Sequence, residues 1–141
     1  MSDGRNPSLP GVPVAARPRP LRVLIADDDR DTVASLEALL HDEGHSTCCV
    51  FHGRDVVFRV ADFGPEVVLL DIGMPGMTGY DVARELRQRY ASAKPILVAV
   101  TAWGTAVDRL MAKAAGIDHH FHKPYDPREL LGLLARIGAR P

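Results

Sequence analysis

The stretch VLIADDDRD (residues 23–31) runs from four apolar or small residues into three consecutive aspartates. An uninterrupted apolar run bounded by polar residues is typical of a buried strand. Carboxylates crowded at the end of such a strand repel one another, so the repulsion must be offset by water or by a positive charge among them. The stretch therefore predicts a strand of a covered sheet with an acidic site at its carboxyl end.

The alternation of an apolar run with a helical pattern occurs five times along the chain. The expected strands are 21–26, 45–51, 66–71, 95–101 and 118–123, and the expected helices are 31–44, 53–63, 79–90, 105–115 and 126–138. In the fourth helix, the apolar positions at helical spacing are Val107, Leu110 and Met111. Strands without polar alternation indicate a parallel sheet covered on both faces. The expected fold is therefore α/β, a doubly wound five-stranded parallel sheet.

Length and composition limit the remaining possibilities. The 141 residues suffice for one domain, expected over 21–138, while residues 1–20 hold five of the 11 prolines and predict a disordered or extended tail. A net charge of −1 gives no global attraction to nucleic acid or an anionic membrane, and no stretch approaches the roughly 18 apolar residues of a membrane span. The neighbouring Cys48 and Cys49 are expected to be reduced, which fits a cytoplasmic protein.

Chemistry-bearing side chains follow four of the expected strands. The first ends in Asp27 and Asp28, the third in Asp71, the fourth in Thr101 and the fifth in Lys123. Function gathers at the carboxyl ends of the strands in an open parallel sheet. Three carboxylates without a His or Cys cluster suit a hard cation such as Mg²⁺. A lone hydroxyl and a lone ammonium beside them match the needs of a phosphoryl group on an aspartate.

Four motifs carry a family resemblance: LIADDD, VVLLDIGMPGMTGYD, AVTAWG and HKPYD, in that order. With them, residues 21–138 resemble the response-regulator receiver domains of two-component signalling. The resemblance implies a flavodoxin-like sheet of strand order 2-1-3-4-5, in which Asp27, Asp28 and Asp71 converge. It implies that Asp71 accepts a phosphoryl group from a phosphohistidine. Asp28 would bind Mg²⁺ directly, Asp27 mainly through water, and Gly73 through its backbone carbonyl.

The resemblance also assigns roles beside the acids. Thr101 would donate its hydroxyl to a phosphoryl oxygen, and Lys123 would pair with the acids and then with the phosphoryl group. Pro124 would fix the Lys123 loop through a cis peptide bond, and Gly79 would supply a tight turn. The family often has an aromatic residue three positions before the lysine, where this chain has His120, so His120 is the candidate switch residue.

Some residues near these motifs have alternative interpretations. Asp29 is interpreted as the N-cap of the first helix in preference to a metal contact. A zinc site of His119, His120 and His122 is disfavoured, because alternation along a strand puts His119 on the opposite face. Trp103 follows Thr101 by two residues and is expected to border the site.

The implied function is a free-standing receiver without a DNA-binding output, which catalyses only its own phosphoryl transfer and autodephosphorylation. The expected partners are a sensor histidine kinase or histidine phosphotransfer protein and a target protein, and a homodimer is possible. One alternative is a receiver-shaped scaffold that is never phosphorylated. The other is a haloacid-dehalogenase-like phosphatase, which needs a second aspartate two residues after the nucleophile, where Asp71 is instead followed by Gly73.

Overall fold

The computed structural model describes residues 18–91 and 94–140, which form five strands and five helices in strict alternation. The strands are β1 (Arg22–Ala26), β2 (Ser46–Val50), β3 (Val67–Leu70), β4 (Ile96–Thr101) and β5 (His119–His122). The helices are α1 (Arg30–Asp42), α2 (Gly53–Phe63), α3 (Gly79–Arg89), α4 (Ala106–Ala115) and α5 (Pro127–Gly138). In this part of the chain no helix is long and apolar enough to cross a membrane.

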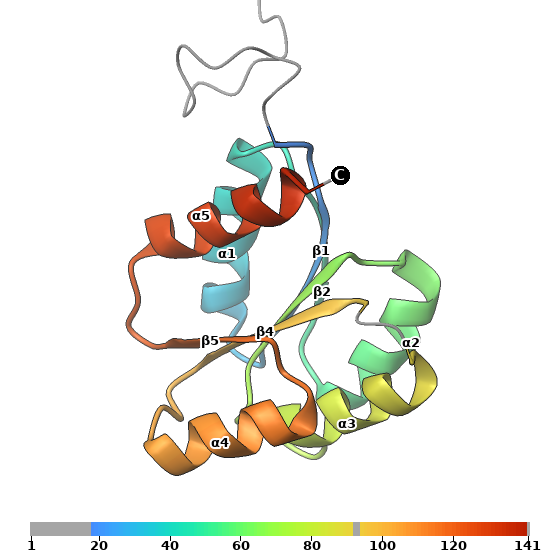
Figure 1. The fold of residues 1–141 in the computed structure, drawn as a ribbon. Coiled ribbons are helices and arrows are strands. Elements are labelled where there is room, and N and C mark those ends of the chain that lie inside the picture. Colours follow the sequence, from blue (N-terminus) through green and yellow to red (C-terminus); the bar gives the residue numbers. More distant parts are fainter. Residues whose placement is uncertain (1–17, 92–93, 141) are drawn as a thin grey trace, which may run out of the picture.

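The five strands form one parallel sheet in the order β2-β1-β3-β4-β5, so the expected doubly wound fold is confirmed. Helices α1 and α5 cover one face, and α2, α3 and α4 cover the other (Figure 1). Successive strand residues alternate between the two layers: Leu24 packs toward α2 and α3, and Ile25 packs toward α1 and α5. Both faces are therefore apolar, which explains the uninterrupted hydrophobic runs in the sequence.

Side-chain caps begin four of the helices. Asp29 is the N-cap of α1 and accepts a hydrogen bond from the Asp31 N–H, which confirms the interpretation made from the sequence. Thr78 and Thr105 begin α3 and α4 with complete capping boxes, and Asp126 caps α5. The strand-to-helix turns at the carboxyl edge of the sheet are thus fixed by local hydrogen bonds.

The expected N-terminal tail, residues 1–20, lies outside the described residues except for 18–20. Within these three, the Arg19 N–H donates to the Gly138 carbonyl at 3.1 Å, and the Arg19 guanidinium pairs with Glu66 at 2.6 Å. The chain therefore enters β1 alongside the end of α5.

The large apolar residues of α4 lie outside the core. Val107, Leu110 and Met111 are 63%, 69% and 43% exposed. The helix packs instead through Ala112 and Ala115, which lie nearly opposite Leu110 at 3.6 residues per turn. Two alanines on the inner face let α4 lie against the sheet with little side-chain volume, and the larger apolar residues remain outside.

Truncating Leu130 of α5 should cost far more than truncating Leu110 of α4, because Leu130 is fully buried between α5 and the sheet. We expect Leu130→Ala to lower the free energy of unfolding by about 2–5 kcal/mol and Leu110→Ala by less than about 0.5 kcal/mol. Urea denaturation of both variants measures the difference. Equal losses would contradict the outward orientation of α4.

Candidate functional site

The site lies at the carboxyl ends of the four strands β1, β3, β4 and β5. Asp27 follows β1, Asp71 follows β3, Thr101 is the last residue of β4, and Lys123 follows β5. Backbone pairing continues past the strands: the Asp71 N–H donates to the Ala26 carbonyl at 2.9 Å, and the Lys123 N–H donates to the Thr101 carbonyl at 2.8 Å. The sheet register therefore brings the four side chains to one edge.

Asp27, Asp28 and Asp71 converge as the sequence analysis expected. Each offers one carboxylate oxygen, and these oxygens all lie within 4.8 Å of one another. An oxygen-only donor set with two carboxylates near the surface suits Mg²⁺, which prefers oxygen ligands and keeps part of its water shell. The cluster thus fits the metal that the sequence implied.

The two neighbouring aspartates of the cluster differ in how they are engaged. Asp27 is buried, and its Oδ1 accepts from the Asp29 N–H at 2.9 Å while its Oδ2 pairs with Lys123 Nζ at 2.7 Å. Asp28 is exposed, and within the described residues no hydrogen bond or ion pair engages its side chain. Asp28 is therefore better placed to ligate a cation directly, and Asp27 to hold one through water.

Asp71 is a carboxylate under opposing influences. Its Oδ1 accepts from the Gly73 N–H at 3.1 Å, and its Oδ2 lies 3.8 Å from Lys123 Nζ. Burial raises the pKa of Asp71, and the charge of Asp27 adds to this, while the Gly73 N–H, Lys123 and the Thr101 hydroxyl oppose it. The pKa of Asp71 is raised on balance, so its surroundings favour the protonated form or a bound cation.

Lys123 is the positive group among the carboxylates. Burial disfavours its charge, but its hydrogen bond to Asp27 and the charge of Asp71 outweigh burial, so the pKa of Lys123 is raised. Lys123 therefore stays protonated at neutral pH and offsets part of the acidic charge. The Lys123–Pro124 peptide bond is cis, as the resemblance implied.

Thr101 and Trp103 close the site on the β4 side. Thr101 is fully buried, and its Oγ1 accepts from the Trp103 N–H at 3.1 Å. The Trp103 indole lies over the backbone of Gly73, where an added Cβ would be only 3.3 Å from Nε1. Because Gly73 has no side chain, the Trp103 indole can cover the loop that follows Asp71.

Comparison with known proteins decides the family. Residues 23–135 match the response regulator receiver domain family, which is most of the chain. The chain belongs to the response regulator receiver domain family. It is thus a receiver domain of two-component signalling, and its aspartate cluster is of the kind at which receiver domains bind Mg²⁺.

Solved receiver structures share the fold of this receiver domain. A putative response regulator from Chloroflexus aurantiacus is 26% identical at a TM-score of 0.78, covering 86% of this chain and 100% of its own. Chemotaxis protein CheY4 of Vibrio cholerae is 24% identical, with a TM-score of 0.77 and coverages of 84% and 99%. The BeF3-activated receiver domain of Klebsiella pneumoniae RstA is 23% identical, with a TM-score of 0.77 and coverages of 85% and 99%.

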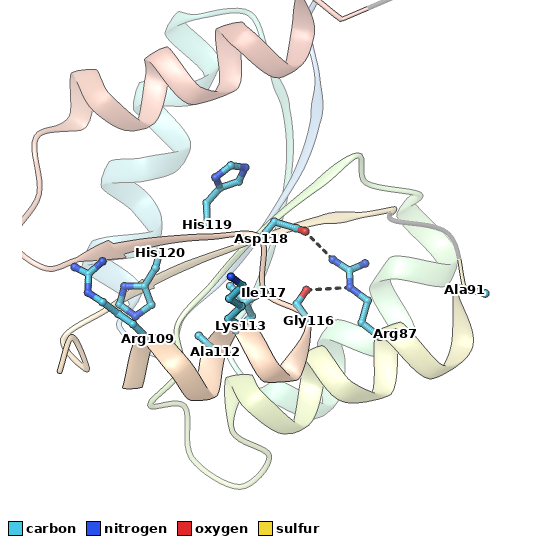
Figure 2. Close-up of a pocket in the computed structure, with 10 residues that line it drawn as sticks. All are labelled: Arg87, Ala91, Arg109, Ala112, Lys113, Gly116, Ile117, Asp118, His119 and His120. Atoms are coloured by element: carbon cyan, nitrogen blue, oxygen red, sulfur yellow. Dashed lines mark hydrogen bonds and ion pairs between the residues drawn. The ribbon is translucent and has the colours of Figure 1, made fainter. Parts of the chain in front are cut away.

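His120 of this receiver domain points from β5 toward Arg109 of α4, while His119 points to the other side of the sheet (Figure 2). Both ring nitrogens of His120 are buried without a hydrogen-bond partner among the described residues. Burial, and then the charge of Arg109, lowers the pKa of His120. His120 is therefore neutral at pH 7, and the opposite directions of His119 and His120 do not suit a shared zinc ion.

His122 holds the loop after β4, a role that its sequence pattern did not predict. His122 Nε2 lies 3.1 Å from the Ala102 carbonyl oxygen, and its ring occupies the space beside Gly104, where an added Cβ would be 2.1 Å from the ring. The available signal was Gly104, three residues after Thr101, but a glycine in a loop has many other uses. His122 thus links β5 to the loop that carries Thr101.

Removing the charge of Asp71 should stabilise the metal-free receiver domain, because burial and Asp27 disfavour the ionised form. A carboxyl group whose pKa is raised in the folded state does not lower the free energy of unfolding below its ordinary pKa of 3.8. It lowers that free energy most at pH values above its folded-state pKa. Asp71→Asn should therefore raise the free energy of unfolding at pH 7, and the gain should shrink as the pH falls toward 3.8.

Urea denaturation in EDTA between pH 4 and pH 8 measures this gain. The control is Asp55→Asn, since Asp55 is exposed in the first turn of α2, where a carboxylate is favourable and its removal yields no gain. A gain that is absent at pH 7 or independent of pH would contradict the assignment of the Asp71 environment.

Proposed function

We propose that the chain is a phosphorylatable switch in which Asp71 accepts a phosphoryl group from a phosphohistidine of a sensor histidine kinase or a phosphotransfer protein. The observation that carries this proposal is the meeting of Asp71 with an ammonium, a buried hydroxyl and two further carboxylates at one sheet edge. The chain would catalyse its own phosphorylation and its own dephosphorylation, in the cytoplasm where such donors act.

In the transfer step, an Asp71 carboxylate oxygen forms a bond to phosphorus as the P–N bond of the phosphohistidine breaks. The donor imidazole leaves with the electron pair of that bond and takes up a proton. The Gly73 N–H fixes Asp71 Oδ1, which leaves Oδ2, on the Lys123 side, as the attacking oxygen. A half-buried carboxylate that is held by a hydrogen bond needs little reorganisation on reaction.

Charge on the phosphoryl oxygens is then stabilised by groups that already surround Asp71. Lys123 is 3.8 Å from Asp71 and can turn its ammonium from Asp27 toward the incoming oxygens. The Thr101 hydroxyl can donate to another of these oxygens. Mg²⁺, held by Asp28, Asp71 and the Gly73 carbonyl and through water by Asp27, would supply further positive charge for the transfer.

A donor protein has a groove to dock on beside the site. The groove, of about 500 Å³, lies between α1 and the loop from β5 to α5, with Leu36, Leu39 and Tyr125 among its lining residues. Tyr125 is close enough to the acidic site that the charge of Asp27 adds to burial in raising the pKa of its phenol. An apolar helix seated there would bring a histidine on its surface close to Asp71.

Phosphorylation would act on the loop after β4. It adds a charge of about −1.5 to −2 at Asp71. The Thr101 hydroxyl, which now accepts from the Trp103 N–H, would turn to donate to the phosphoryl group and draw the loop inward. His122 of β5 contacts the Ala102 carbonyl in this loop, and His120 of β5 lies near Arg109 of α4. The movement would therefore reach β5 and α4. A target protein responds only if it prefers one of the two states.

Incubation with acetyl phosphate and Mg²⁺ should add one phosphoryl group to the chain, as read by intact-mass spectrometry. The gain should disappear in EDTA and in Asp71→Asn, because one removes the cation and the other the nucleophile. Asp81→Asn on α3 is the matched control and should gain normally. A gain that survives in Asp71→Asn would contradict the proposal, and no gain in any condition would favour the scaffold alternative.

Lys123→Ala should still be modified at Asp71 but should not change conformation. Loss of the ammonium removes the link between the phosphoryl group and the end of β5, whereas the nucleophile remains. The fluorescence of Trp103, the only tryptophan, reports on the loop beside the site. Beryllofluoride with Mg²⁺ should change this fluorescence in the unaltered chain and not in Lys123→Ala, and an unaltered response in the variant would remove Lys123 from the switch.

A further inference from the structure

One peptide group in the loop after β4 is held at both of its polar ends by side chains. Its N–H, from Trp103, donates to Thr101 Oγ1 at 3.1 Å. Its carbonyl oxygen, from Ala102, lies 3.1 Å from His122 Nε2. Since a carbonyl oxygen only accepts, His122 Nε2 carries the hydrogen and donates it. Thr101 and His122 therefore fix one planar peptide unit between them.

The sheet places His122 at this peptide group. In the pairing of β4 with β5, His122 stands directly opposite Thr101, so both side chains lie on the same face of the sheet. Lys123 follows His122 along the chain, and its N–H donates to the Thr101 carbonyl at 2.8 Å. His122 thus adjoins both of the side chains that are proposed to bind the phosphoryl oxygens.

The backbone of this loop depends on side-chain contacts. Within residues 18–91 and 94–140, no backbone–backbone hydrogen bond engages Ala102, Trp103 or Gly104. The His122 ring also fills the space beside Gly104, because the three atoms nearest to an added Cβ all belong to that ring. Gly104 does not have a positive φ, so its backbone conformation does not require glycine. The ring of His122 is therefore the obstacle that a side chain at position 104 would meet.

The proposed switch would move this peptide group against His122. As the Thr101 hydroxyl turns toward a phosphoryl oxygen, the Trp103 N–H either follows it or loses its partner. The Ala102 carbonyl moves in both cases, because the peptide unit is planar. His122 is fixed in β5, so its hydrogen bond to that carbonyl opposes the movement. The net strength of one hydrogen bond corresponds to about a three- to tenfold change in an equilibrium.

We propose that His122 is a positioning residue that holds the Ala102 carbonyl in its unphosphorylated position and thereby weakens the binding of a phosphoryl group at Asp71. This inference rests on the proposed switch function and names a residue that regulates it. His122 acts through Thr101, because the peptide group that it holds is the one that the Thr101 hydroxyl must leave or carry along. Removal of the imidazole shifts the equilibrium toward the state that binds the phosphoryl group.

Beryllofluoride, as a stand-in for the phosphoryl group, measures this shift. It is titrated into the full chain at saturating Mg²⁺ with the fluorescence of Trp103 as the signal. His122→Ala should bind it about three- to tenfold more tightly than the unaltered chain does. Mg²⁺ alone should bind both chains equally. His122 is exposed, so its truncation leaves the core intact, and a merely structural loss would not tighten binding.

Three further variants make the test specific. His122→Gln retains an N–H donor and should bring the affinity for beryllofluoride back toward that of the unaltered chain. The matched control is His119→Ala, because His119 lies on the same strand but points to the other side of the sheet (Figure 2). It should bind as the unaltered chain does. Gly104→Ala should tighten binding by displacing the ring, and it should have no further effect in His122→Ala, where that space is free.

Hydrogen exchange tests the contact without any phosphoryl group. In the metal-free ¹⁵N-labelled chain, the Trp103 amide should exchange with solvent faster in His122→Ala than in the unaltered chain or in His119→Ala. Equal exchange in all three would overturn the assignment of His122 as the residue that holds this peptide group.

The role of His122 and the proposed function can fail separately. If the unaltered chain binds beryllofluoride but His122→Ala binds it equally or more weakly, only the role of His122 is overturned. A tightening of the same size in His119→Ala would also overturn it. If the unaltered chain neither responds to beryllofluoride nor gains mass from acetyl phosphate, the proposed function is overturned, and the role of His122 in it falls too.

Discussion

The ion pair between Lys123 and Asp27, at 2.7 Å, is the interaction on which the site depends. It joins the end of the edge strand β5 to the end of β1, near the other side of the sheet, and it places a positive charge where three carboxylates converge. Lys123 offsets part of the charge of a buried aspartate that has two other carboxylates beside it. The crowding of acids after β1 is therefore offset by Lys123, 96 positions after Asp27 in the sequence.

The same arrangement orients the Asp71 carboxylate. Burial and Asp27 raise its pKa, whereas the Gly73 N–H, Lys123 and the Thr101 hydroxyl oppose that rise. These influences leave a carboxylate that is oriented but not neutralised by a close ion pair, since Lys123 lies 3.8 Å from it and 2.7 Å from Asp27. A phosphoryl group on Asp71 would offer Lys123 and Thr101 a stronger partner than each has now. The switch we propose is thus a competition for two side chains between existing contacts and a new anion.

Helix α4 packs against the sheet through small residues and leaves its larger apolar residues outside. Its inner face uses Ala112 and Ala115, which fill little space, and its outer face exposes Val107, Leu110 and Met111. The cations Arg109 and Lys113 stand beside that outer face without a carboxylate partner in the part of the chain that the structure describes.

The sequence by itself determined the strands, the parallel sheet, the helix cap at Asp29, and the strand ends at which Asp27, Asp71, Thr101 and Lys123 stand. These features follow from local patterns, because residues close together in the sequence set the hydrophobic period, the helix caps and the ends of the strands. Only the tertiary structure decided which side of α4 faces the core, that Trp103 covers Gly73, and that His120 turns toward Arg109. Each of these depends on which surfaces of distant elements pack together, and neighbouring positions in the sequence do not encode that.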